Sequence, residues 1–322
     1  MRQFAKPTIV VSKCLEFDAC RYNGEMIPDV TIRNLQPFVT FIPVCPEVEI
    51  GLGTPRETIR IVEENGENRL VQPSTREDVT EKMEQFSNDF LQTISDVDGF
   101  ILKNRSPSCG TRDVKIYSGF EKAPAKGKGS GLFGGAAVKK FSHLPIEEEG
   151  RLSNFIIREH FFTRLFTIAY YKMIKHNKNM KDLVSFQSDN KYLFMAYNQV
   201  KQKELGRIIA NHKNEKIEVV FENYEKTLYE LFMRTPRYTS NVNVCEHIFG
   251  YFKTKLKKQE KDHFIELLQK YAEKKIPLSS LLTILKSWAI RFDEKYLLRQ
   301  TYFEPYPEAL VEISDSGKGR DY

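Results

Sequence analysis

The chain of 322 residues has 41% hydrophobic and 29% charged residues, a globular composition that excludes a disordered or fibrous protein and favours two domains over one. No stretch approaches the roughly 18 apolar residues of a membrane span, and no signal-peptide cleavage site follows the N-terminus, so we expect a cytoplasmic protein. The net charge of +6 arises in the second half, where 30 Lys and Arg oppose 21 Asp and Glu. This excess suggests a polyanionic partner, although a solvated basic helical surface would give the same charge.

Short β-branched or apolar runs predict strands at residues 8–12, 38–44 and 97–102. Between the last two strands, the apolar residues of the segment 76–94 recur at helical spacing. Strands that alternate with a helix indicate a parallel sheet. We therefore predict an α/β domain with a mainly parallel sheet over residues 1–152.

Glycine and lysine dominate residues 125–135, AKGKGSGLFGG. A Gly-rich loop can bind phosphate, but this segment lacks the Lys-Ser/Thr ending of a P-loop. We therefore expect a flexible surface loop here. A helix is predicted to follow at 135–141 and to end before Leu144 and Pro145.

From residue 153 onward the pattern becomes helical, which predicts an all-α domain over residues 153–310 and a flexible tail at 311–322. Ser153 is the predicted N-cap of the first helix. The later helical patterns are separated by Pro236 and Pro277. They cover residues 191–212, 215–233, 241–258, 260–274 and 278–299.

The five cysteines are an odd number, which argues against a disulfide framework in a cytoplasmic chain. Three of them, Cys14, Cys45 and Cys109, each lie just after a predicted strand. The carboxyl ends of parallel strands meet at one edge of a sheet, so these thiols should lie close together. We predict a metal site there. The alternative is three unrelated core cysteines, which would be expected in the middle of strands.

Soft thiolates suit zinc or an iron–sulfur cluster. Three thiolates do not complete a four-coordinate structural zinc site, but they can hold three irons of a cubane cluster and leave the fourth iron open as a Lewis acid. Nearby cations are expected to lower the thiol pKa values and favour the thiolate. These cations are Lys13, Arg21, Lys103, Arg105 and Arg112.

The segments SKCLEFDACRYNG, PVCPEVEIGLGTPRE and KNRSPSCG resemble, in this order, the signatures of the thiouracil desulfidase (TudS-like) family. This resemblance implies a [4Fe-4S] cluster held by Cys14, Cys45 and Cys109 with one open iron, and it excludes Cys20 as a ligand. The second half, especially residues 192–210, resembles the helical domain of YbgA-like proteins. Fused proteins of this kind act on 4-thiouridine in tRNA, so the resemblance implies that the helical domain binds RNA.

The resemblance also implies a non-redox desulfuration, in which the substrate sulfur binds the open iron and an activated water replaces it by oxygen. We predict Glu47 as the general base, whereas the alternative is a Glu that caps the following helix. Ser106 is predicted to contact the substrate or relay a proton, with Ser108 as the second candidate and a turn-forming role as the alternative. Further candidates for substrate binding are Ser12, Arg21 and Tyr22, whose ring could stack on a base.

RNA binding by the second half predicts basic and aromatic residues on a shared face, although each lysine alone is more simply an exposed helix residue. The loop at 234–243 combines both kinds of residue. Cys245, His160 and His247 fall in helical patterns and are expected to be structural. The RNA-binding candidates are Lys191, Lys201, Lys203, Arg207, Arg234, Arg237, Tyr238, Lys253, Lys255, Lys257 and Lys258.

The sequence therefore predicts an iron–sulfur desulfidase that acts on thiolated uridine in tRNA. Three alternatives remain open. The first keeps the chemistry but acts on free thiouracil, the second is an RNA-binding protein with a structural or sensory cluster, and the third is a zinc hydrolase with water as the fourth ligand. The oligomeric state does not follow from the sequence.

Overall fold

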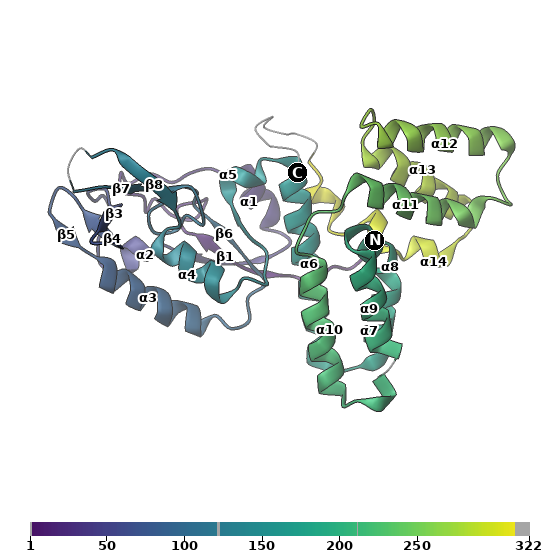
Figure 1. Cartoon of the computed structure of the whole chain (residues 1–322), viewed down its shortest axis with the longest axis horizontal. Coiled ribbons are helices and arrows are strands. Elements are labelled where there is room, and N and C mark those ends of the chain that lie inside the picture. Colours follow the sequence, from purple (N-terminus) through teal and green to yellow (C-terminus); the bar gives the residue numbers. More distant parts are fainter. Residues whose placement is uncertain (1, 121–122, 211, 313–322) are drawn as a thin grey trace. The chain divides into compact units, whose positions relative to one another are not determined.

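The computed structural model describes residues 2–120, 123–210 and 212–312 (Figure 1). The chain divides into two compact units. The first runs to Ala169 and takes in the segment from Pro307, and the second runs from Tyr170 to Tyr306. The predicted α/β half and helical half are both confirmed. Most of the tail predicted at 311–322 lies outside the described residues.

A four-stranded parallel sheet forms the centre of the first unit, in the order β2-β1-β6-β9. Val10 in the middle strand pairs with Ile42 on one side and Phe100 on the other. Because β1 and β6 are buried almost throughout, their residues are mostly apolar without a polar alternation, and β1 is rich in β-branched residues. The strands are β1 (Thr8–Ser12), β2 (Thr40–Val44), β6 (Gly99–Leu102) and β9 (Ile146–Glu148).

A second, mixed sheet in the same unit has the order β5-β4-β3-β7-β8 and was not predicted. Strands β3 and β4 form a hairpin that turns at Asn65 and Gly66, both with positive φ. An Asn-Gly pair favours this turn because both residues tolerate the left-handed conformation. The strands are β3 (Arg60–Glu64), β4 (Glu67–Gln72), β5 (Glu77–Asp78), β7 (Val114–Tyr117) and β8 (Ala125–Gly129).

The prediction of a flexible loop at 125–135 is wrong. Its first half is β8, which pairs with β7 in an antiparallel ladder, and its second half begins helix α4 (Leu132–Lys140). The helix predicted at 76–94 is confirmed as α3 (Thr80–Thr93). These two helices pack together through aromatic contacts of Phe133 with Phe86 and Phe90.

Three short helices complete the first unit: α1 (Val30–Leu35), α2 (Pro46–Glu49) and α5 (Glu149–Leu152). The long helix α6 (Phe155–Asn177) follows, and its first part belongs to this unit. The prediction that Ser153 caps α6 is wrong. Asn154 caps it, because its Oδ1 accepts a hydrogen bond of 3.1 Å from the N–H of Ile157.

The second unit is helical and has an aromatic core in which Tyr171, Phe186, Phe194 and Tyr224 are fully or almost fully buried. The helix predicted at 191–212 is two helices, because the side chain of Asn198 caps a new helix at this point. No helix in the described ranges is long and apolar enough to cross a membrane. The helices are α7 (Met180–Asp189), α8 (Lys191–Tyr197), α9 (Gln199–Ala210), α10 (Ile217–Leu231), α11 (Tyr238–Phe249), α12 (Lys258–Ala272), α13 (Leu278–Arg291) and α14 (Lys295–Leu298).

Candidate active site

A cavity of about 220 Å³ opens at the carboxyl edge of the parallel sheet. Its walls come from the loops that follow β1, β2 and β6, which is where ligands bind in parallel α/β sheets. All nine site residues predicted from the sequence line this cavity. They are Ser12, Cys14, Arg21, Tyr22, Cys45, Glu47, Ser106, Ser108 and Cys109.

Four thiols, rather than three, belong to this cavity. Cys45 and Cys109 are buried and Cys14 is half-buried. Cys20 is also buried, and its thiol makes hydrogen-bond contacts with the thiols of Cys14 and Cys45. The thiol of Cys45 additionally donates to the backbone carbonyl of Cys20 at 3.7 Å. The loop after β1 therefore supplies two thiols to the site.

The expectation that nearby cations lower the thiol pKa values is wrong for three of these cysteines. Burial raises the pKa of Cys109 to about 12. Contact with the thiol of Cys14 raises the pKa of Cys20 to about 11, and contact with Cys20 together with burial raises the pKa of Cys45 well above its usual value. Several cations are instead paired with carboxylates, in the pairs Lys13–Asp18, Arg21–Glu25 and Lys103–Glu149.

The loop after β6 contains a chain of hydroxyl groups that ends on Glu47. The hydroxyl of Ser108 donates to Oε1 of Glu47 at 2.5 Å. Since a hydroxyl has one proton, the 2.9 Å hydrogen bond between Ser106 and Ser108 then has Ser106 as its donor. Ser106 also accepts hydrogen bonds from the N–H groups of Ser108 and Cys109, so it closes the turn that carries Cys109. The two serines are thus hydrogen-bonded to each other and to Glu47, as a proton relay would need, and Ser106 also forms the turn.

The loop that carries Cys109 rests on the first turn of α4. The N–H of Gly134 donates to the carbonyl of Ser108 at 2.9 Å, and that of Gly131 donates to the carbonyl of Gly110 at 2.7 Å. A Cβ atom at Gly134 would overlap the carbonyl oxygens of Cys109 and Gly110. Glycine is therefore needed at Gly134 for the close approach of these two backbones.

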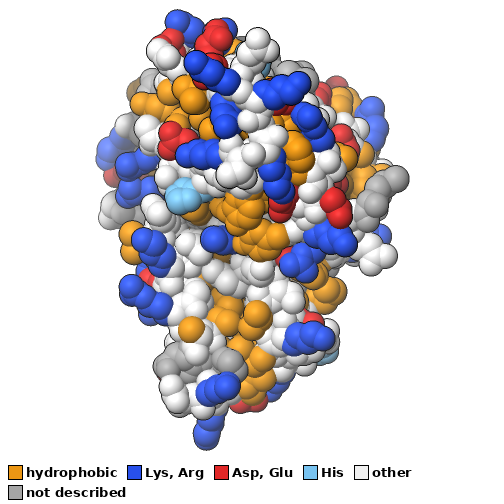
Figure 2. Space-filling view, turned by 90° about the vertical axis from the view of Figure 1, so that its right-hand side faces the viewer, with side chains coloured by type: hydrophobic (Ala, Val, Ile, Leu, Met, Phe, Trp, Pro, Cys, Tyr) orange, Lys and Arg blue, Asp and Glu red, His pale blue; other side chains and the backbone are white. Residues whose placement is uncertain are grey.

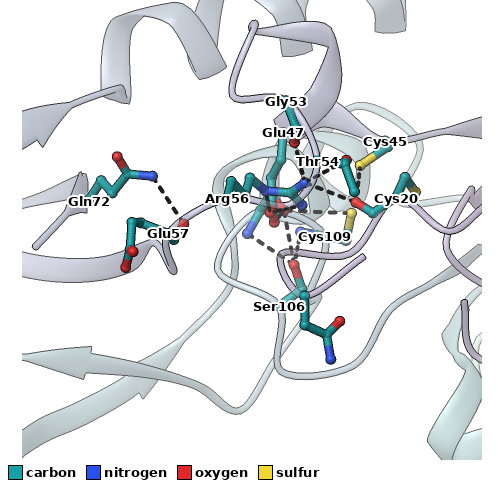
Figure 3. A network of polar contacts seen from close by, with 12 residues as sticks. Cys20, Cys45, Glu47, Gly53, Thr54, Arg56, Glu57, Gln72, Ser106 and Cys109 are labelled. Carbon is teal, nitrogen blue, oxygen red and sulfur yellow. Dashed lines mark hydrogen bonds and ion pairs between the residues drawn. The ribbon is translucent and has the colours of Figure 1, made fainter. Parts of the chain in front are cut away.

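Glu47 lies in the first turn of α2, and Cys45 is the N-cap residue of this helix. Its carboxylate is bound by the guanidinium of Arg56, whose Nε donates to Oε2 at 2.9 Å and whose Nη2 donates to the same oxygen (Figure 3). The two side chains are only 4% and 13% exposed, so this is a buried ion pair. Sequence reasoning missed Arg56, because nothing in GLGTPRE distinguishes it from an exposed loop arginine.

Two of the candidates for substrate binding, Ser12 and Tyr22, differ in their exposure to solvent. Ser12 is buried, and its hydroxyl accepts a hydrogen bond of 2.9 Å from the N–H of Lys103, which ties the end of β1 to the loop after β6. Tyr22 is 42% exposed at the cavity wall, and the guanidinium carbon of Arg21 lies 5.4 Å from its ring centroid. The Tyr22 ring is therefore the accessible flat surface of the cavity.

In the second unit, two of the basic candidates are paired with carboxylates. Lys201 forms ion pairs with Glu204 and Glu230, and Lys255 forms one with Glu294. A hollow of about 370 Å³ lies between the ends of α8, α10 and the start of α11, and its lining includes Arg234 and Arg237. Lys and Arg side chains also surround apolar ones over much of the face drawn in Figure 2.

Of the remaining residues expected to be structural, Cys245 and His160 are packed into the fold, whereas His247 is exposed and its role stays a prediction. Cys245 is buried, and its sulfur lies 3.9 Å from the hydroxyl of Tyr302. Burial lowers the pKa of His160 to about 3, so this imidazole is neutral at physiological pH. His247 lies in the last turn of α11.

Two family models match the chain. A model of the 2-thiouracil desulfurase family matches residues 9–149, and a model of a domain of unknown function, DUF1722, matches residues 191–307. The uncharacterized protein YbbK of Bacillus subtilis (strain 168) is 36% identical over 118 residues, which cover 34% of this chain and 77% of YbbK. The uncharacterized protein YbgA of Escherichia coli (strain K12) is 23% identical over 156 residues, which cover 48% of this chain and 92% of YbgA.

A solved structure of a [4Fe-4S]-dependent thiouracil desulfidase, TudS, is 27% identical with a TM-score of 0.36, and the match covers 46% of this chain and 93% of that one. The α/β unit and its thiol-lined cavity define a desulfurase domain joined to a helical domain. The chain belongs to the 2-thiouracil desulfurase family and carries a DUF1722 domain after it.

Proposed function

We propose that this protein is a hydrolytic desulfidase that replaces the sulfur of a thiolated uracil by oxygen, with 4-thiouridine in tRNA as its main substrate. The observation that carries the proposal is that three cysteines and the Ser106–Ser108–Glu47 chain line one cavity. The cavity thus combines soft metal ligands with a carboxylate that can accept a proton. Membership of the 2-thiouracil desulfurase family supports a thiolated uracil as the substrate.

The donor set of the cavity fits a [4Fe-4S] cluster held by Cys14, Cys45 and Cys109. The three thiols come from three separate loops that meet at this cavity, whereas Cys20 lies on the same loop as Cys14. When bound, the cluster would supply a Lewis acid for the substrate sulfur.

The protein itself supplies binding and proton transfer. The exposed ring of Tyr22 offers a surface on which a uracil ring can stack. In the reaction, the oxygen of water bonds to the ring carbon and the C–S bond breaks. One proton of the water goes to Glu47 and the other leaves with the sulfur as hydrosulfide, so no electrons enter or leave the protein. The hydroxyls of Ser108 and Ser106 then provide a path along which the proton leaves Glu47.

The experiment is to purify the protein anaerobically, measure iron and the absorption spectrum, and assay sulfide released from thiolated tRNA and from free 4-thiouracil. We expect an iron–sulfur spectrum and release of sulfide. A colourless protein with stoichiometric zinc would contradict the cluster. If only free 4-thiouracil is consumed, the free base is the substrate, and if neither compound is consumed, the desulfidase itself is refuted.

The hollow lined by Arg234 and Arg237 in the second unit favours a thiolated uridine within RNA over the free base as the substrate. Arg234 and Arg237 are exposed at its lining, and the acidic residue there, Glu230, is paired with Lys201. The net charge of the hollow is therefore positive, which suits a phosphate group. RNA bound there would lose affinity as salt increases.

A double substitution, Arg234→Ala with Arg237→Ala, tests this contact. We expect the affinity for tRNA to fall by roughly tenfold or more. The slope of log affinity against log salt concentration should correspond to about one to two fewer counterions released from the RNA. Turnover of free 4-thiouracil should not change. Lys270→Ala is the matched control, because Lys270 is already paired with Glu266. Equal losses in the two variants would show that RNA does not bind at the hollow.

A further inference from the structure

We propose that Arg56 is a positioning residue of the active site, which holds the Glu47 carboxylate in the one orientation that leaves an oxygen lone pair free for water. This inference rests on the proposed function. It assigns to Arg56 a role in turnover that is separate from the binding of metal or substrate.

The first step is the geometry of the ion pair. Nε and Nη2 of Arg56 both donate to Oε2 of Glu47. A carboxylate has about four lone-pair positions, two on each oxygen. Arg56 therefore occupies both positions of Oε2.

The second step concerns the other oxygen. Oε1 accepts the hydrogen bond of 2.5 Å from the hydroxyl of Ser108. Three of the four acceptor positions of Glu47 are thus filled, and the fourth lies on Oε1. A water molecule that loses its proton to Glu47 has to approach this position. It lies next to the hydroxyl of Ser108, which is hydrogen-bonded to Ser106.

The third step is that Arg56 is itself fixed by groups of the site. Its Nη1 donates to the carbonyls of Cys20 at 2.9 Å and Gly53 at 2.8 Å, and it lies 3.4 Å from Oγ1 of Thr54. Its own N–H donates to the carbonyl of Tyr22 at 2.8 Å. Figure 3 shows the guanidinium of Arg56 beside Glu47, Gly53, Thr54 and Cys20. The side chain of Arg56 therefore connects the loop after β1 to the loop that follows α2 through hydrogen bonds.

A lysine cannot replace this arrangement. The guanidinium uses its planar set of donors to bind one carboxylate oxygen and two carbonyl oxygens at the same time. An ammonium group would keep the charge but lose the paired contact with Oε2 that, together with the Ser108 contact to Oε1, holds the carboxylate in place. Because proton transfer depends on this geometry, turnover should suffer while substrate binding does not.

The test compares Arg56→Ala and Arg56→Lys with the wild type, all with their cofactor loaded. We expect kcat to fall by about 100-fold in each, with KM within about threefold of the wild type. Millimolar guanidinium should restore turnover of Arg56→Ala by about tenfold, whereas urea, which is planar but uncharged, should not. Arg69→Ala is the matched control, because Arg69 pairs with Asp78 on the surface of the same unit.

A second readout does not depend on activity. In a crystal structure of Arg56→Ala, the hydrogen bond between Ser108 and Glu47 should be lost or the carboxylate rotated. Retention of that contact, a normal kcat in Arg56→Lys, or equal rescue by urea would overturn the positioning role. If the wild type desulfurates no thiolated uracil, the proposed function fails, and the crystal structure still decides whether Arg56 positions Glu47.

Discussion

The hydroxyl of Ser108 donates a hydrogen bond of 2.5 Å to Oε1 of Glu47, although the two residues are 61 positions apart in the chain. This contact joins the loop that carries Cys109 to the helix that begins after Cys45. The hydrogen bond therefore links the proposed proton acceptor to the segments that carry two of the proposed cluster ligands. Changes at either residue should affect turnover.

Glu47→Gln should reduce kcat by about 100-fold to 10,000-fold, because an amide cannot accept the proton of water. The iron content should be unchanged. The protein should also lose stability, on the order of 3 kcal/mol, because the buried Arg56 loses its anionic partner. Sulfide release and thermal unfolding measure the two effects. Normal turnover would show that Glu47 is not the base, and the exposed Glu49→Gln on the same helix is the control.

Ser108→Ala and Ser106→Ala should differ in their effects. Ser108→Ala removes the donor to Glu47, so kcat should fall by roughly tenfold to 100-fold with the cluster retained. Ser106→Ala also leaves the N–H groups of Ser108 and Cys109 without their acceptor, which costs about 1–3 kcal/mol in stability. Parallel measurements of kcat and melting temperature separate these cases. Identical melting temperatures of the two variants would contradict the turn-closing role of Ser106.

Cys20→Ser should keep its full iron content, whereas Cys109→Ser should lose most of it. The thiol of Cys20 contacts the thiols of Cys14 and Cys45, so a serine hydroxyl can fill the same space without serving as a ligand. Iron analysis after anaerobic reconstitution checks both variants. If Cys20→Ser loses iron while Cys14→Ser keeps it, the loop after β1 contributes Cys20, and our choice of ligands is wrong.

Gly134→Ala should destabilise the first unit by about 1–3 kcal/mol, because the new methyl group overlaps the carbonyls of Cys109 and Gly110. The displaced loop should also release iron faster on exposure to air. Gly127→Ala is the matched control, since a Cβ atom there meets nothing within 4 Å. Equal melting temperatures of the two variants would show that the loop does not depend on this close contact.

Glu159→Gln should stabilise the protein at high pH only. Burial raises the pKa of Glu159 from 4.5 to about 7, so the folded state keeps a proton that the unfolded state releases. The contribution of Glu159 to the free energy of unfolding therefore declines as the pH rises from about 4.5 to about 7, and it stays low above that pH. The amide should gain on the order of 3 kcal/mol at about pH 8 and little at about pH 4. Melting curves at both pH values test this, with the exposed Glu64→Gln as a control.

The parallel sheet could be predicted because its strands are continuous apolar runs, as in residues 8–12, which form β1 with the predicted bounds. The convergence of the cysteines in one cavity followed from the same strands. The second sheet could not be read in this way, since β4 contains the polar run Glu67-Asn68-Arg69. Its one clear signal was the Asn65-Gly66 pair, which is typical of a two-residue hairpin turn.

The placement of residues in the cavity could be predicted where they follow a strand closely, as with Glu47 and Ser106. Arg56 and Gly134 could not be found in this way. The role of Arg56 depends on a carbonyl 36 positions away and on burial, and neither is visible in the sequence. A glycine-rich segment likewise has the same composition whether it is a mobile loop or a site of close backbone contact.

The support of the Cys109 loop by α4 also bears on the order of events during synthesis. Translation must pass Lys140, the end of α4, before the third thiol has the helix turn on which its loop rests. A nascent chain that stops before residue 132 contains all three cysteines but lacks this support. A cofactor held by all three thiols would therefore depend on a loop whose support is synthesised after the last of the three cysteines.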